Sequence, residues 1–79
     1  MNDKVKEVLA EVFDMKSSEI TVGLTKDDID TWDSLRQMDL VTSLEKEFDI
    51  RLEMMEIVSL DSVAKTVEIL KSKGVDVGD

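Results

Sequence analysis

The sequence contains no cysteine, no histidine and no proline, and it has a single tryptophan. Without cysteine the chain forms no disulfide and no thiolate metal site. Without histidine it also lacks the base of Ser-His-Asp and Cys-His catalysis, and the ligands of nearly all zinc sites. The length of 79 residues indicates one domain. A chain this short buries only about 60% of its unfolded surface. Few ways therefore remain for it to catalyse a reaction alone.

Basic residues are also few. Asp and Glu number 19 against 10 Lys and Arg, which gives a net charge of −9 and an isoelectric point near 4.3. This balance repels nucleic acid and anionic membranes and attracts a basic protein partner. At 42% hydrophobic residues, the chain is too apolar for a disordered acidic tail. No apolar run approaches the roughly 20 residues of a membrane span, and no signal peptide follows Met1. We expect a cytoplasmic protein that does not insert into membranes.

Helical periodicity is the main structural signal in the chain. It predicts a first helix over residues 3–14, with Asn2 or Asp3 as the N-cap, a second from near Ser34, and a third from near Ser59 or Leu60. The apolar stripe of the first helix is Val5, Val8, Leu9, Val12 and Phe13. That of the second is Leu40, Leu44 and Phe48, with Leu35, Met38 and Val41 beside them. That of the third is Leu60, Val63, Ala64, Val67 and Leu70. Gly74 suits the position after the last helix, and residues 75–79 read as a frayed tail.

Two less regular stretches separate these helices. Residues 51–58 are expected to hold one short helical turn, with Met54 and Met55 as core filler or as lining of an adaptable apolar cavity or surface. Residues 16–33 form a long loop, in which Ile20, Leu24 and Ile29 are expected to enter the core. Within it, Thr25 and Asp28 are spaced as a capping box. The predicted fold class is all-α, a small antiparallel bundle of three main helices plus one short helix, with a long loop between the first and second.

The junction between the long loop and the second helix carries Asp33-Ser34-Leu35. Unpaired backbone N–H groups and the helix dipole favour negative charge there, so a phosphate ester on the Ser34 hydroxyl would be tolerated. We expect Leu35 to turn inward and leave that hydroxyl accessible. The alternative is purely structural, because Ser34 followed by Gln37 also matches an N-cap with its capping box.

The wider pattern resembles the acyl carrier protein family and its aminoacyl and peptidyl relatives. The resemblance covers nearly the whole chain, and its motifs are Asp33-Ser34-Leu35, Leu40, Leu44-Glu45, Phe48, Ile50, Leu52 and Asp61-Ser62-Val63. It implies that Ser34, flanked by Asp33 and Leu35, carries 4′-phosphopantetheine from coenzyme A, attached by a separate transferase. The thiol of this group would hold acyl intermediates as thioesters, so the missing cysteine and histidine are supplied with the cofactor. The chain would be a carrier and not an enzyme.

The same resemblance implies docking of the second helix onto basic patches of a loading ligase and of acyl-processing enzymes. Residues 33–56 hold seven acids against three bases, for a local net charge of −4. The candidate docking residues are Arg36, Met38, Asp39 and Glu45. Fatty-acid carriers commonly have an acid directly after the motif, where this chain has Arg36. They tend to have a small residue before it, where this chain has Trp32. These two departures favour a specialised pathway of fatty-acid or polyketide type. The plainer alternatives are an Arg36–Asp39 pair on the helix surface and a Trp32 that packs the loop.

Other sites fit less well. An EF-hand register that begins at Asp28 puts Trp32 at the fifth position, and Asp33 where glycine is needed. No metal site is therefore predicted beyond loose binding of a divalent cation by Asp27, Asp28 and Asp30. We expect a monomer whose core loosens to shelter an acyl chain, and whose fold is stabilised by salt or divalent cations. The remaining alternatives are an aminoacyl or peptidyl carrier and a non-enzymatic acidic helical adaptor.

Overall fold

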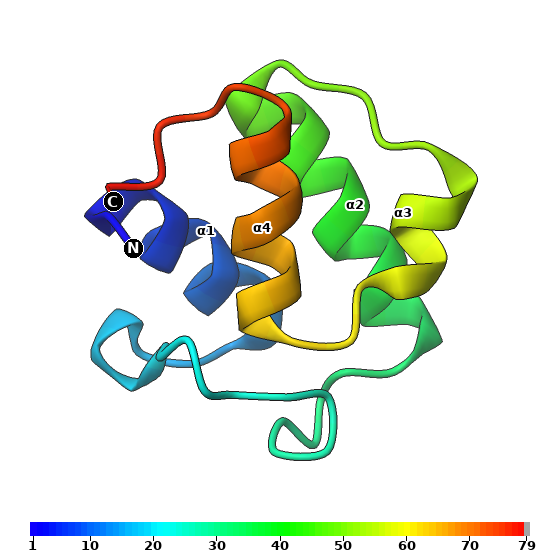
Figure 1. Cartoon of the computed structure of the whole chain (residues 1–79). Coiled ribbons are helices and arrows are strands. Elements are labelled where there is room, and N and C mark those ends of the chain that lie inside the picture. Colours follow the sequence, from blue (N-terminus) through cyan, green and yellow to red (C-terminus); the bar gives the residue numbers. More distant parts are fainter. Residues whose placement is uncertain (79) are drawn as a thin grey trace.

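The computed structural model describes residues 1–78 and shows a helical bundle (Figure 1). Its elements are α1 (Asp3–Phe13), the short 3-10 helix η1 (Ser17–Glu19), α2 (Ser34–Phe48), α3 (Met54–Ser59) and α4 (Val63–Ser72). Helix α1 runs opposite to α2 and α4, which run in the same direction because the segment through α3 returns the chain to the end where α2 begins (Figure 1). The predicted fold class, with three main helices, one short helix and a long first connection, is confirmed.

The core forms where the apolar stripes of α1, α2 and α4 meet. All five predicted residues of α1 are buried, and Asn2 is its N-cap. Helix α2 buries Leu40, Val41 and Leu44, with Phe48 packed beside them. Ala64 is exposed, contrary to the predicted stripe of α4. That helix also begins later than predicted, because the Ser62 hydroxyl caps it by accepting a hydrogen bond from the Lys65 N–H.

The long loop is anchored to the bundle, as predicted. Ile20 and Ile29 are buried, and Leu24 is half-buried against the same core. The Asp28 carboxylate accepts hydrogen bonds from the Thr25 N–H and hydroxyl, so the capping-box residues close a turn without starting a helix. Two backbone bonds then join the loop to the α3–α4 junction, from Lys26 N–H to the Asp61 carbonyl at 2.8 Å and from Val63 N–H to the Leu24 carbonyl at 2.9 Å.

The tryptophan packs this loop against the bundle. Trp32 is only 4% exposed, and its ring lies 4.6 Å from that of Phe13 at the end of α1, centroid to centroid. The Thr31 hydroxyl also donates to the Phe13 carbonyl. The structural alternative for Trp32 is therefore confirmed, and the residues just before α2 are held against α1.

The C-terminal segment is ordered up to residue 78, so the predicted frayed tail is wrong for residues 75–78; residue 79 lies outside the described part. Gly74 has a φ of +85° and ends α4 as predicted. After it Val77 is buried, and its carbonyl accepts a hydrogen bond from the Asn2 N–H at 2.8 Å. The Asn2 side chain donates to the Asp76 carbonyl. These bonds join the two ends of the described chain.

Candidate functional site

Helix α2 is capped by Asp33 and not by Ser34. The Asp33 carboxylate accepts a hydrogen bond from the Arg36 N–H at 2.9 Å, and its backbone is extended, as an N-cap requires. The structural alternative, in which Ser34 is the N-cap and forms a capping box with Gln37, is therefore wrong. Both Asp and Ser are good N-caps, and here the one earlier in the chain takes the position.

The Ser34 side chain is consequently free at the first turn of α2. Ser34 is exposed, and within residues 1–78 its hydroxyl has no hydrogen-bond partner. It lies at the N-terminus of a 15-residue helix, where the dipole and the unpaired N–H groups favour a phosphate group. The residues present thus fit a phosphate ester on this oxygen, which an outside enzyme could reach.

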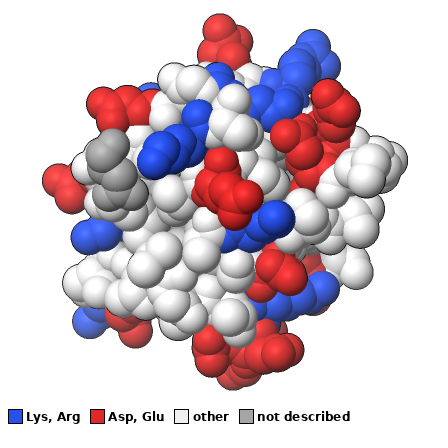
Figure 2. Space-filling model, viewed as in Figure 1, with Lys and Arg blue, Asp and Glu red and all other residues white. Residues whose placement is uncertain are grey.

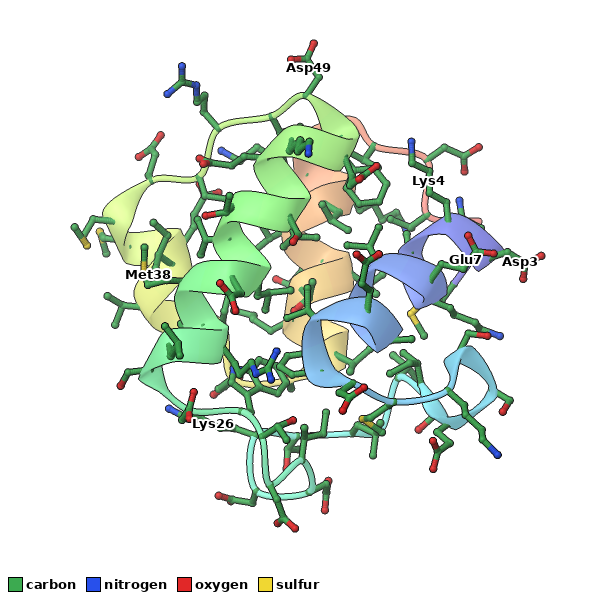
Figure 3. All side chains as sticks on the ribbon, turned by 180° about the vertical axis from the view of Figure 1, so that it is seen from behind. Asp3, Lys4, Glu7, Lys26, Met38 and Asp49 are labelled. Atoms are coloured by element: carbon green, nitrogen blue, oxygen red, sulfur yellow. The ribbon has the colours of Figure 1, made fainter. Side chains whose placement is uncertain are left out.

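Leu35 does not turn inward as predicted. Its side chain is 72% exposed, whereas Leu40 farther along α2 is fully buried. Met38 and Val58 are also exposed. An open hollow of about 360 Å³ lies beside Ser34, and Figure 3 shows Met38 extending from α2 toward α3 and Lys26 near the start of α2. The lining residues are Lys26, Ser34, Gln37, Met38, Ile57, Val58, Leu60 and Asp61.

Gln37 is the site residue whose role the sequence did not reveal. Its side-chain oxygen accepts a 2.6 Å hydrogen bond from the Trp32 indole N–H. Its side-chain nitrogen donates to the carbonyls of Ile57 at 2.7 Å and Leu60 at 3.1 Å. The side chain therefore joins the loop, α2 and the end of α3 directly behind Ser34. A polar residue one turn after the motif was the only signal, and it matched a capping box equally well.

The predicted docking residues fall into two pairs. Met38 and Asp39 are exposed on α2. Arg36 and Glu45 are half-buried and make internal contacts: the Arg36 guanidinium donates to the Val12 carbonyl at 2.9 Å, and the Glu45 carboxylate accepts from the Leu52 N–H at 3.0 Å. Arg36 thus reaches back to the C-terminal end of α1, where a positive charge is favoured by the helix dipole.

The acids of the loop do not assemble a metal site. Among residues 1–78, no group of three or more Asp or Glu side chains is placed to hold a metal ion. The Asp28 carboxylate is already occupied by Thr25. In the same part of the chain, no helix has the length and apolar character needed to cross a membrane.

Comparison with known proteins agrees with this geometry. Residues 3–70 match the family model described as "Phosphopantetheine attachment site". The chain is 35% identical over 72 residues to polyketide-8 synthase acyl carrier protein 2 of Streptomyces avermitilis, covering 90% of this chain and 82% of that one. It is 32% identical to an acyl carrier protein of Petrotoga mobilis, over 90% of this chain and 84% of the relative.

A solved structure shows the same fold. The solution structure of a holo acyl carrier protein from Geobacter metallireducens superposes with a TM-score of 0.79 at 32% identity, over 90% of this chain and 82% of that one. Acyl carrier proteins hold 4′-phosphopantetheine covalently and present acyl groups to enzymes without being enzymes themselves. From the residues that match, the fold and the helix that begins at Ser34, we conclude that this chain belongs to the acyl carrier protein family.

Proposed function

We propose that Ser34 is the residue of this chain that carries the 4′-phosphopantetheine group. The observation that carries the proposal is its exposed hydroxyl, which is left without a partner among residues 1–78 because Asp33 caps the helix. In the attachment the Ser34 oxygen forms a bond to the phosphorus next to the pantetheine of coenzyme A. The diphosphate bond breaks, adenosine 3′,5′-bisphosphate leaves and the hydroxyl proton is released.

Three side chains prepare this position. Asp33 fixes the first turn of α2, and Trp32 holds the preceding loop in the core, so the Ser34 oxygen projects from a rigid junction. Leu35 lies exposed beside it and offers an apolar contact to a phosphopantetheinyl transferase. When bound, the cofactor supplies a terminal thiol that holds an acyl group as a thioester.

The proposed partners are that transferase, an acyl-loading ligase and acyl-processing enzymes with basic docking patches. Met38 and Asp39 form the exposed part of the docking surface on α2. Arg36 and Glu45 stay predictions as docking residues, since each also makes an internal contact. A net charge of −9 supports basic partners, and it opposes self-association, which supports a monomer.

We assign the protein to a specialised pathway of fatty-acid or polyketide type, acting as a single carrier domain in the cytoplasm. Arg36, which stands where fatty-acid carriers commonly have an acid after the motif, supports this assignment. So does the likeness to a Streptomyces avermitilis protein named as a polyketide synthase carrier. An aminoacyl or peptidyl carrier would share the fold and the arm, and the cargo accepted from a loading ligase separates the two.

The test is modification by coenzyme A and a broad-specificity phosphopantetheinyl transferase, read by intact mass. We expect one phosphopantetheine adduct on the wild-type chain and none on Ser34→Ala. Ser62→Ala is the matched control, because Ser62 also follows an aspartate at a helix start, but its hydroxyl is occupied by the Lys65 N–H. An adduct that survives Ser34→Ala would refute the assignment. Absence of any adduct would instead favour the acidic helical adaptor.

A further inference from the structure

Lys26 is a base near Ser34 whose ammonium group takes no part in holding the fold. Its side chain is exposed, and among residues 1–78 the ammonium forms no ion pair and no hydrogen bond. Lys26 and Ser34 both line the open hollow at the start of α2, and Figure 3 shows the lysine near that end of the helix. Among the residues that line this hollow, Lys26 has the positive charge and Asp61 the negative one.

The backbone of Lys26 is fixed, although its side chain is not. Its N–H donates to the Asp61 carbonyl at 2.8 Å. The preceding residue, Thr25, pairs with Ser62 in an isolated antiparallel bridge. The side chain of Lys26 therefore starts from a part of the long loop that is bonded to the α3–α4 junction, and its four methylene groups let the ammonium reach into the hollow at the start of α2.

The other charged groups around Ser34 leave this ammonium available. The Asp33 carboxylate is used by the cap of α2, and the Arg36 guanidinium donates to a carbonyl in the last turn of α1. The Asp61 carboxylate is exposed and is in no ion pair within residues 1–78. A phosphate on Ser34 would add a negative charge next to Asp33 and Asp61, and a contact with an unpaired cation would offset that repulsion.

We propose that Lys26 binds the phosphate through which the phosphopantetheine arm is attached to Ser34. The inference rests on the proposed attachment at Ser34. A phosphodiester keeps one negative charge on its unesterified oxygens, to which the Lys26 ammonium donates a charge-assisted hydrogen bond. The contact holds the base of the arm toward the long loop. It also offsets one of the charges that the cofactor adds to a chain whose net charge is already −9.

The test uses holo protein made with coenzyme A and a broad-specificity phosphopantetheinyl transferase and checked by intact mass. The phosphorus-31 NMR signal of the phosphodiester is compared in wild type, Lys26→Gln and Lys26→Arg. We expect the signal to shift in Lys26→Gln and to stay near the wild-type position in Lys26→Arg, which keeps the charge. The shift in Lys26→Gln should shrink in about 0.5 M sodium chloride, because the contact is exposed and is screened by salt.

The wild-type chain also gives a readout without any variant. The side-chain methylene signals of Lys26 should move when the apo protein is converted to the holo protein, and those of Lys46 should not. Lys46 is likewise exposed, but it lies near the other end of α2, about 18 Å from Ser34 along the helix axis. Lys26 methylene signals that stay in place on loading would overturn the proposal.

Lys46→Gln is the matched control, because it removes the same charge from the same surface. Its phosphorus signal should stay at the wild-type position. Equal shifts in Lys26→Gln and Lys46→Gln would overturn the proposal, since they would show only an effect of net charge, and so would a shift in neither. Failure of the wild-type chain to take up the cofactor would refute attachment at Ser34 itself, whereas loading without any effect of Lys26 refutes only the present inference.

Discussion

At the start of α2, two adjacent residues divide the tasks of capping the helix and presenting a hydroxyl. Asp33 accepts the hydrogen bond from the first turn, and the Ser34 oxygen is therefore exposed and has no hydrogen-bond partner within residues 1–78. If Ser34 were the cap, its oxygen would be engaged with a backbone N–H, as the Ser62 oxygen is at the start of α4. An acid before the serine thus has a physical role in making the serine available.

The Asp33 cap should be measurable as stability. We expect Asp33→Ala to lower the free energy of unfolding by about 1 kcal/mol, which corresponds to a fall of about 4–8 °C in melting temperature for a domain of this size. Asp33→Asn retains a capping oxygen and should lose much less. Thermal unfolding followed by circular dichroism tests both. Equal losses in the two variants would show that charge, and not the capping hydrogen bond, is what Asp33 provides.

At this scale the sequence predicted that the Ser34 hydroxyl is accessible, but it did not predict the contacts around that residue. The exposed Ser34 and the packed Trp32 followed from local pattern. The exposure of Leu35 and the contacts of Gln37 did not. Leu35 is 72% exposed although an inward position was predicted for it, and Gln37 binds carbonyls 20 and 23 residues away, which no local pattern contains. A helical period shows which residues share a face, but it does not show what that face meets.

Among helices α1 to α4, α3 is the one that has no buried residue. A helix of six residues is not stable in isolation, and this one buries none of them completely. The Glu56 carboxylate of α3 makes two contacts. It accepts a hydrogen bond from the Glu53 N–H at 2.9 Å and forms an ion pair with Lys73 at 2.7 Å. The hydrogen bond from the Glu53 backbone, and then Lys73, hold the pKa of Glu56 below its ordinary value of 4.5.

A lowered pKa in the folded state makes the contribution of Glu56 dependent on pH. The stabilisation is fully present above the unfolded-state pKa, about 4.5, and is lost as pH falls through the lower folded-state pKa. We therefore expect wild type to be more stable than Glu56→Gln at pH 7, with the difference shrinking as pH falls below 4.5. Urea unfolding of both proteins across this range measures it.

Lys73→Met serves as the control for this prediction. It removes the ion pair but leaves the larger cause, the Glu53 hydrogen bond, in place. The stability of Lys73→Met should therefore still depend on pH in this range, by less than the stability of the wild type does. Glu56→Gln should lack this dependence. A constant difference between wild type and Glu56→Gln at all pH values would contradict the assigned role of the carboxylate.

Elements with a continuous apolar stripe were the easiest to predict. Helix α1 matches its pattern at all five stripe positions, because a single face of it meets the core. The ordered segment after α4 gave no such signal. Its position depends on one buried residue, Val77, and on hydrogen bonds from Asn2 to Asp76 and Val77, which lie more than 70 residues away and so fall in no local window.

For the molecule as a whole, electrostatic self-repulsion acts against a small core. A net charge of −9 is carried by a body whose Cα radius of gyration is 11.2 Å. Figure 2 shows acidic side chains at many separate places on the visible face, with basic ones between them and uncharged surface around both. The screening length is about 10 Å in 0.1 M salt, comparable with the size of the protein. Added salt therefore weakens repulsion across the whole surface.

We accordingly expect the melting temperature to rise when sodium chloride is increased from about 0.01 to 0.5 M, and to rise also in millimolar Mg²⁺ at constant pH.

The variants Asp14→Asn and Asp49→Asn test the same effect at single positions. Both residues follow helix ends with left-handed backbone, at φ 56° and 52°, which asparagine tolerates, and each places a negative charge at the negative end of a helix dipole. Each variant should therefore melt higher than wild type in low salt, by an amount that shrinks as salt increases. Two results together would contradict this prediction: a melting temperature that does not respond to salt or Mg²⁺, and asparagine variants whose melting temperature rises by the same amount at all salt concentrations. They would show that surface charge does not limit the stability of this fold.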